Sequence, residues 1–264
     1  MPDAAGLYVY ALVRAAVLDG GLGTGIDDLP LVAVSAGPVA AIVHEHPGAP
    51  YDGEDEETLR RRVLQHNDVV ERLWSRDRAV LPMTFDVIVG AAEHETAQDR
   101  LTTWLRSVEE AALEGLGRAA GRVELRVDLA LDRGDAASAD PDVLALRDRI
   151  RTEQPGIARL LRKRLDGLER EAADAVADRI YPDVRARLAR HSVDVIENPR
   201  ASAGDRQVLV LSTALLVDEG SVERVGRELA AITEEETALR ELFLVPWPPY
   251  SFAALRPAAS APPL

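Results

Sequence analysis

Two periods of apolar residues alternate along this chain, and together they predict an α+β protein with two domains. The period of two that is typical of strands is clearest at residues 6–13 and 123–131, where residues of one kind recur at every second position and would share one face of a strand. Helical spacing of three and four residues is clearest at 56–77 and 219–236, where it produces one apolar stripe per helix. Because strands and helices follow one another in mixed order, the pattern predicts layers of helix packed on sheet.

The first half of the chain predicts an N-terminal α+β domain over residues 1–118. On its first strand, the even positions Tyr8 and Tyr10 face one side, and we expect Leu7, Val9 and Val13 to face the other. The predicted elements are strand 6–13, a hairpin of 31–34 and 39–44, helix 56–77, strand 80–89 and helix 93–117.

The second half predicts a domain over residues 119–253 with the order strand, helices, strand, strand, helix, strand. This is the order of a modified ferredoxin-like βαββαβ fold, in which helices cover one face of the sheet. We expect Pro182 to kink or end the long second helix, and residues 254–264, rich in proline and alanine, to form a disordered tail. The predicted elements are strand 123–131, helix 141–152, a helix from 157 toward 182, strands 193–196 and 207–217, helix 219–236 and strand 241–247.

Aromatic residues gather just after the last predicted strand. The chain has only 11 aromatic residues, and four of them lie between Phe243 and Phe252. Prolines at 246, 248 and 249 remove backbone donors, so strand pairing should stop there and leave a stiff, extended segment. Two interpretations are open. The segment either docks on the protein's own surface, or presents Trp247, Tyr250 and Phe252 to a partner protein.

Composition narrows the class of protein. A net charge of −14 disfavours binding to nucleic acid, and the basic cluster Arg159–Arg164 is soon followed by acids, as on the solvated face of a long helix. No run of about 18 uncharged apolar residues predicts a membrane span. There is no cysteine, and the first residues lack the pattern of a secretory signal, so we expect a cytoplasmic protein.

Candidate catalytic and metal-binding residues are few. His44 and His46 share one face of a strand, but no third metal ligand is evident nearby, and His66 lies within the apolar stripe of the first helix, typical of a core histidine. The glycine-rich loop 20–25 lacks the spacing of a dinucleotide-binding fingerprint and favours a mobile connection. We therefore predict no catalytic residues, no cofactor and no metal, and a protein that is not an enzyme.

Three stretches, taken in order, carry a resemblance to a known family. They are Leu7-Tyr-Val-Tyr-Ala-Leu-Val13, Val80-Leu-Pro-Met-Thr-Phe85 and Val245-Pro-Trp-Pro-Pro-Tyr-Ser-Phe-Ala253, with Gly25-Ile26 and Gly37-Pro-Val-Ala-Ala-Ile-Val43 between the first two. With this order and spacing, the chain resembles the gas vesicle protein F/L family. It departs from the family's usual Leu-Pro-x-Arg-Phe-Gly sequence in the middle motif, because Thr84 and Asp86 stand where arginine and glycine are expected.

The resemblance implies a non-enzymatic accessory protein of gas vesicle formation with two α+β domains, the second of them modified ferredoxin-like. It also implies contact with the hydrophobic shell protein, gas vesicle protein A, and with other accessory proteins, as a chaperone, nucleator or minor structural component located in the cytoplasm or the vesicle. A soluble, charged protein with a partly apolar docking face suits that role. The alternative is a regulatory module that binds a small molecule in its ferredoxin-like domain.

Overall fold

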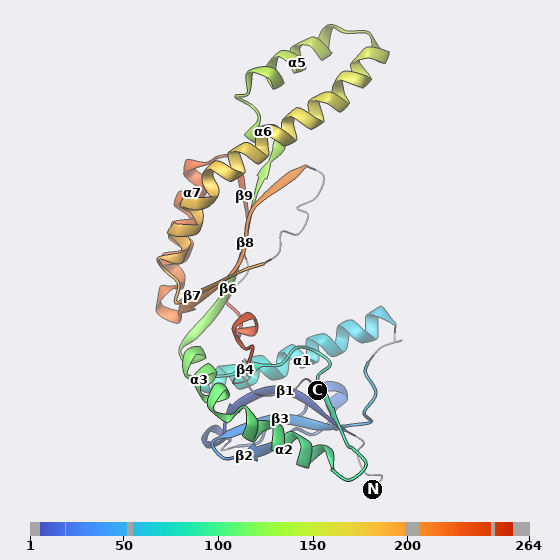
Figure 1. The fold of residues 1–264 in the computed structure, drawn as a ribbon, viewed down its shortest axis with the longest axis vertical. Coiled ribbons are helices and arrows are strands. Elements are labelled where there is room, and N and C mark those ends of the chain that lie inside the picture. Colours follow the sequence, from blue (N-terminus) through green and yellow to red (C-terminus); the bar gives the residue numbers. More distant parts are fainter. Residues whose placement is uncertain (1–5, 19, 52–54, 199–205, 244–245, 256–264) are drawn as a thin grey trace. The chain divides into compact units, whose positions relative to one another are not determined.

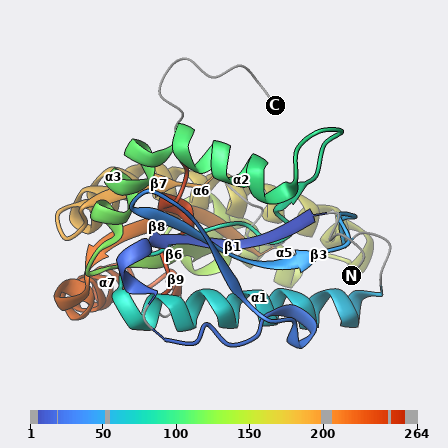
Figure 2. The same cartoon turned by 90° about the horizontal axis from the view of Figure 1, so that it is seen from below.

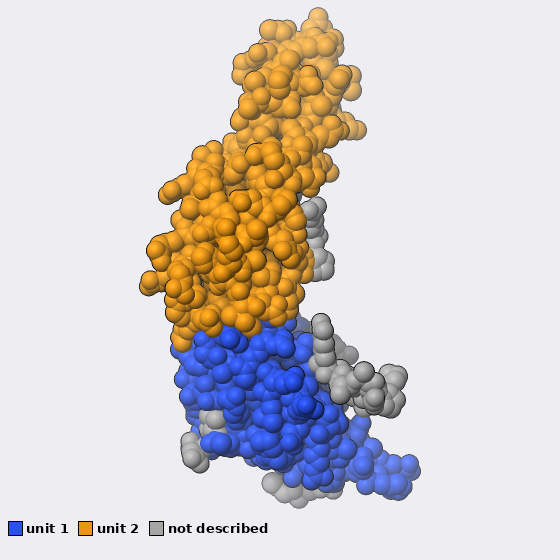
Figure 3. All heavy atoms as spheres, turned by 60° about the vertical axis from the view of Figure 1, so that its left-hand side comes forward, with its two compact units in different colours: residues 1–124, 247–264 blue, residues 125–246 orange. Residues whose placement is uncertain are grey.

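The computed structural model describes residues 6–18, 20–51, 55–198, 206–243 and 246–255. The chain divides into two compact units, one of residues 1–124 together with 247–264 and one of residues 125–246 (Figure 3). The sequence places the boundaries at 118 and 253 instead. The C-terminal segment from residue 247 onward therefore belongs to the first unit.

The first unit is built on one antiparallel sheet with helices on both faces. Its strands are ordered β2-β3-β1-β4, and β5 also pairs with β1. Figure 2 shows α1 along one face of the sheet and α2 with α3 along the other. The elements are β1 (Gly6–Arg14), η1 (Ala15–Val17), η2 (Ile26–Asp28), β2 (Val32–Ala36), β3 (Val39–His46), α1 (Glu56–Asp77), β4 (Leu81–Pro82), β5 (Ile88–Gly90), α2 (Ala97–Ser107), α3 (Glu109–Ala119) and η4 (Tyr250–Phe252).

A bulge in the central strand changes which residues share a face. The pairing of β1 with β3 shifts register between Val9 and Ala11. Consequently Leu12, and not the expected Val13, joins Leu7 and Val9 in the core cluster under α2. The extra residue of a bulge moves every later side chain to the other face, and simple alternation cannot show where it falls.

Two predicted elements of this unit are each divided in two. The strand expected at 80–89 is the short pair β4 and β5, because Asp86 between them has a left-handed backbone with φ of 72° that no strand accommodates. The helix expected at 93–117 begins later, at a capping box of Thr96 and Asp99, and breaks into α2 and α3 at Val108, where φ is −111°.

The glycine-rich loop after β1, which we expected to be a mobile connection, makes several contacts with α1. Arg72 and Arg76 of α1 donate hydrogen bonds to the carbonyl oxygens of Thr24 and Gly21. Asp27 in the same loop forms ion pairs with Arg61 and Arg62. The guanidinium groups of one helix therefore bind the loop along its length.

The second unit contains a four-stranded antiparallel sheet ordered β7-β8-β6-β9. Figure 1 shows α6 and α7 on the same side of this sheet. The predicted central position of the strand at 207–217 is confirmed, since β8 has a neighbour on each side. The elements are β6 (Arg122–Asp132), α4 (Arg133–Ala136), α5 (Pro141–Thr152), α6 (Pro155–Ala189), β7 (Asp194–Glu197), β8 (Gln207–Asp218), η3 (Glu219–Ser221), α7 (Val222–Glu235) and β9 (Leu239–Phe243).

The longest helix continues past its proline. α6 reaches Ala189, so Pro182 does not end it, which was one of the two effects we expected of this proline. Ile180 and Val184, on either side of the proline, are both buried. Packing of this stretch in the core therefore outweighs the one backbone hydrogen bond that proline removes. Within the described residues, none of the helices combines the length and hydropathy that a membrane crossing requires.

The C-terminal segment is attached to the first unit through Glu124. The backbone groups of Trp247 and Glu124 exchange two hydrogen bonds, of 2.9 and 3.0 Å. The buried Glu124 carboxylate also accepts hydrogen bonds from the backbone N–H and the Oγ–H of Ser251, both at 2.7 Å. Further along, Ala253 is buried in the core cluster under α2. Residues 244–245 and 256–264, including most of the predicted disordered tail, lie outside the described residues.

Removing the Glu124 carboxylate should weaken this attachment. We expect Glu124→Ala to lower the free energy of unfolding by about 2 kcal/mol, because the N–H of Ser251 loses a charged acceptor. Glu124→Gln should cost less, since an amide still offers one acceptor and one donor. Urea unfolding measures both effects, with Glu114→Ala on the exposed face of α3 as the control. Equal stability of Glu124→Ala and the control would contradict this role.

Candidate functional site

Two tyrosines and three histidines of the first unit form one buried cluster between the sheet and α1. Tyr8, Tyr10, His44, His46 and His66 are each at most 3% exposed. The ring of His44 stacks on that of Tyr8, with centroids 5.0 Å apart. A buried polar group must have hydrogen-bond partners, so the proton positions in this cluster follow from its geometry.

Tyr8 links three segments of the chain through one hydroxyl group. Its oxygen accepts a hydrogen bond from the backbone N–H of Asp86, at 3.1 Å, so its proton is free to be donated to Nδ1 of His66, at 2.9 Å. Nε2 of His66 then carries the proton and donates to the carbonyl of Met83, at 3.1 Å. His66 is therefore held as one neutral tautomer, and the expected core histidine is confirmed.

Tyr10 links the end of the glycine-rich loop to β3 in the same way, through its hydroxyl group. Its hydroxyl accepts from the backbone N–H of Ile26 and donates to Nδ1 of His44, both at 2.8 Å. A side chain at Gly25 would place its Cβ 2.2 Å from the Tyr10 hydroxyl oxygen, so only glycine allows this approach. The Gly25-Ile26 pair of the sequence motif thus serves the tyrosine on β1.

Burial determines the charge state of this cluster. Burial lowers the pKa of His44 and His66 to about 4, and it also lowers the pKa of His46, so all three rings are neutral near pH 7. Burial likewise raises the pKa of the Tyr8 and Tyr10 hydroxyls. Nε2 of His44 has no hydrogen-bond partner among the described residues. Those same residues include no group of three side chains that could bind a metal ion.

The two departures from the family's middle motif both follow β4 and have different surroundings. Asp86 adopts a positive φ of 72°, a backbone conformation that favours glycine. Its carboxylate accepts hydrogen bonds from the backbone N–H of Tyr51, at 3.3 Å, which a glycine would not provide. Thr84 is exposed and lines the hollow described next.

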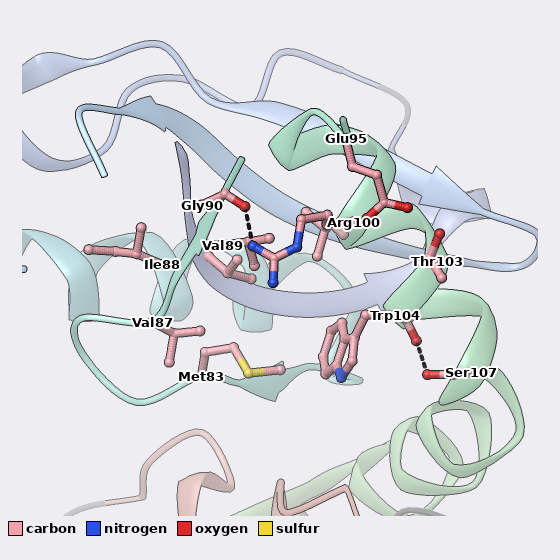
Figure 4. Close-up of a pocket in the computed structure, with 12 residues that line it drawn as sticks. Met83, Val87, Ile88, Val89, Gly90, Glu95, Arg100, Thr103, Trp104 and Ser107 are labelled. Carbon is pink, nitrogen blue, oxygen red and sulfur yellow. Dashed lines mark hydrogen bonds between the residues drawn. The ribbon is translucent and has the colours of Figure 1, made fainter. Parts of the chain in front are cut away.

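An apolar groove crosses the first unit on the side of β5 and α2. It consists of two hollows, of about 540 and 320 Å³, that share Met83 and Trp104 in their walls. Figure 4 shows Met83, Val87, Val89 and Trp104 around the larger hollow, with Arg100 reaching from α2 toward β5. The guanidinium of Arg100 donates to the carbonyl of Gly90 and fixes that end. We call this surface the Met83–Trp104 groove.

The walls of the groove come from β5 and α2, from the middle and C-terminal motifs, and from Val9 of β1. The larger hollow is lined by Val9, Met83, Val87, Ile88, Val89, Gly90, Glu95, Arg100, Leu101, Thr103, Trp104 and Ser107. The smaller hollow is lined by Pro82, Met83, Thr84, Trp104, Tyr250, Ala253, Ala254 and Leu255. Most of these side chains are apolar, which suits an apolar side chain or segment of a partner better than a charged substrate.

The aromatic residues singled out in the sequence have separate positions. Tyr250 lines the smaller hollow, and its hydroxyl donates to Oδ1 of Asn67 in α1, at 3.0 Å. Trp247 pairs with Glu124 through its backbone, and neither its side chain nor that of Phe252 belongs to the groove walls. The groove residues Met83, Val87 and Trp104 escaped the sequence analysis. Two signals pointed to them: Met83 lies in the middle motif, and Trp104 on the apolar stripe of α2.

Comparison with known proteins identifies the class to which this chain belongs. A sequence profile described as gas vesicle synthesis protein GvpL/GvpF matches residues 6–254. The chain therefore belongs to this family of gas vesicle accessory proteins, as the resemblance of its motifs indicated.

Relatives and solved structures agree with this assignment. The chain is 30% identical over 262 residues to gas vesicle protein L1 of Halobacterium salinarum, covering 94% of this chain and 90% of that protein. It is 28% identical over 242 residues to gas vesicle protein L of Haloferax mediterranei, covering 87% and 72%. The crystal structure of gas vesicle protein GvpF from an Anabaena species has a similar fold, with a TM-score of 0.65, 18% identity and coverage of 95% and 97%.

The buried histidines predict an acid-sensitive fold. Their folded-state pKa of about 4 lies below the ordinary value of 6.5, so the unfolded chain binds the protons first. The contribution of His44 and His66 to the free energy of unfolding is thus fully present above pH 6.5. It is lost as the pH falls toward 4, by about 3 kcal/mol per histidine.

Urea unfolding between pH 7 and 5 measures this loss. We expect His66→Gln, which has no titrating ring, to reduce the slope of stability against pH, whereas His94→Gln on an exposed turn should leave it unchanged. A wild-type stability that stays constant over this range would contradict the buried neutral rings.

Proposed function

We propose that this protein acts in gas vesicle assembly by binding the hydrophobic shell subunit through the Met83–Trp104 groove. Membership of the accessory-protein family places the chain in this process. The groove supports the specific role, because it is an apolar surface on an otherwise charged protein. A shell subunit with an apolar gas-facing surface needs such a partner before it assembles, and the partner then serves as chaperone, nucleator or minor component of the vesicle.

The arrangement of the groove favours recognition of an apolar segment. Trp104 is half-buried and stands between the two hollows, so its indole offers a large apolar contact to whatever occupies either one. Tyr250 and Leu255 of the C-terminal segment line the smaller hollow, so this segment forms part of the proposed binding surface. Trp247 and Phe252 remain predicted partner contacts outside the groove walls.

We also propose that the second unit is a modified ferredoxin-like domain. Its elements follow the order strand, helices, two strands, helix and strand, and its strand order β7-β8-β6-β9 supports this assignment. The protein would act in the cytoplasm or at the vesicle, with other accessory proteins as further partners.

The alternative function is small-molecule binding. A hollow of about 540 Å³ is large enough for a small ligand. It lies in the first unit, however, and not in the domain where we expected a ligand. A thermal-shift screen against nucleotides and amino acids separates the two functions, because a ligand that binds only the folded state stabilises the fold, and more so as its concentration rises above its Kd.

Truncating the centre of the groove tests the proposed function. We expect Trp104→Ala and Met83→Ala to reduce the amount of shell protein that copurifies after co-expression by about tenfold, because a few central apolar residues carry most of the energy of an interface. The matched control is Leu64→Ala on α1, which truncates an apolar side chain that is 55% exposed and distant in sequence from the groove. Undiminished copurification with folded groove variants would overturn the proposal.

A further inference from the structure

A helical hairpin in the second unit carries a second, unusual surface. Figure 1 shows α5 and the first half of α6 extending beyond the end of the sheet of this unit. The two helices are held together by the ion pair of Arg147 with Glu169, at 2.7 Å, and by the buried side chains of Val143, Leu146 and Ala158. The outward side of this hairpin is therefore displayed by a packed structure.

Large apolar side chains lie on the outward side of the hairpin. Leu160 is 72% exposed, the highest value among the exposed large hydrophobic residues described, and Ile157 is 44% exposed. Together with Arg164 they lie three and four residues apart, so they share one face of α6. On α5, Leu144 is 46% exposed. Exposed large apolar side chains at helical spacing, such as Ile157 and Leu160, are typical of a face that another chain covers.

The stretch of chain that carries this surface is basic, although the whole protein is strongly acidic. Between Arg147 and Arg164 there are seven basic residues and two acidic ones, whereas the whole chain has a net charge of −14. The three arginines of α5 form ion pairs with Glu169, Glu153 and Asp148. In α6, by contrast, four exposed cations have no ion pair among the described residues. They are Arg159, Arg162, Lys163 and Arg164.

From this combination we infer that the outward face of the α5–α6 hairpin binds an acidic amphipathic helix of a partner protein. Such a helix would pack its apolar stripe on Ile157 and Leu160 and place its carboxylates near Lys163 and Arg164. Arginine is suited to this role because its guanidinium pairs with a carboxylate through two hydrogen bonds. Nucleic acid and anionic lipid fit less well, because an extended polyanion meets the field of the whole acidic chain. This surface shares no residue with the groove.

A designed peptide tests the inference directly. The probe is a fluorescent amphipathic helix of about 20 residues with a leucine stripe and a glutamate polar face. Its binding to the full-length protein is followed by fluorescence anisotropy at low and high salt. The same peptide with lysine in place of glutamate is the charge control. We expect the glutamate peptide to bind, and to bind more weakly at high salt, whereas the lysine peptide should not bind.

Two variants of the hairpin make the test specific. Leu160→Ser removes the central apolar contact, and the triple change of Arg162, Lys163 and Arg164 to Gln removes the charge. Each should weaken binding of the glutamate peptide by about tenfold or more. The matched control combines Leu64→Ser and Arg60→Gln on the exposed face of α1, and should bind as the wild type does. Trp104→Ala should also leave binding unchanged, so that failure of the groove and failure of the hairpin are separable.

Three results would overturn the inference. One is a glutamate peptide that does not bind, or that binds the hairpin variants as tightly as the wild type. Another is binding of phosphatidylglycerol vesicles or of single-stranded DNA that the hairpin variants abolish while the peptide is not bound. The last is self-association of the wild type in light scattering that the same variants abolish, because the occupant would then be a second copy of this chain.

Discussion

Two tyrosine hydroxyls on the inner face of the central strand determine how the first unit is built. A phenol group buried next to a sheet must find both a donor and an acceptor, because an unpaired polar group in the core costs about 1–3 kcal/mol. Tyr8 and Tyr10 find their acceptors in His66 and His44. Their donors are the backbone N–H groups of two loops far apart in the sequence. One strand thereby positions the glycine-rich loop, the middle motif and α1.

The opposite face of the same strand supports the groove. Leu7, Val9 and Leu12 pack under α2, and Val9 also lines the larger hollow. Met83 of the middle motif belongs to both the tyrosine network and the groove. Its backbone carbonyl accepts a hydrogen bond from His66, and its side chain lines the groove. The polar network on one face and the apolar groove on the other are therefore joined through a single short segment. A binding surface on such a support keeps its shape when a partner arrives.

Much of this fold could be predicted from periodicity, and the failures have local causes. The limits of α1 and α5 match the expected ranges because α1 has a long apolar stripe, whereas α5 begins at the Asp140 cap with Pro141 in its first turn. The bulge at Val9–Ala11, the left-handed Asp86 and the passage of α6 through Pro182 depend on contacts far along the chain, and local pattern carries no trace of them. The groove was missed for the same reason. Met83 and Trp104 are ordinary apolar residues until the sheet and α2 bring them together.

The coupling between Tyr8 and His66 is the most direct measure of the central claim. A double-mutant cycle of Tyr8→Phe and His66→Leu in urea unfolding should give a coupling energy of about 1 kcal/mol or more, because each single change leaves the other partner buried and unpaired. The same cycle of Tyr8→Phe with Tyr250→Phe, whose hydroxyl bonds Asn67, should be additive. Additive effects of Tyr8→Phe and His66→Leu would contradict the account.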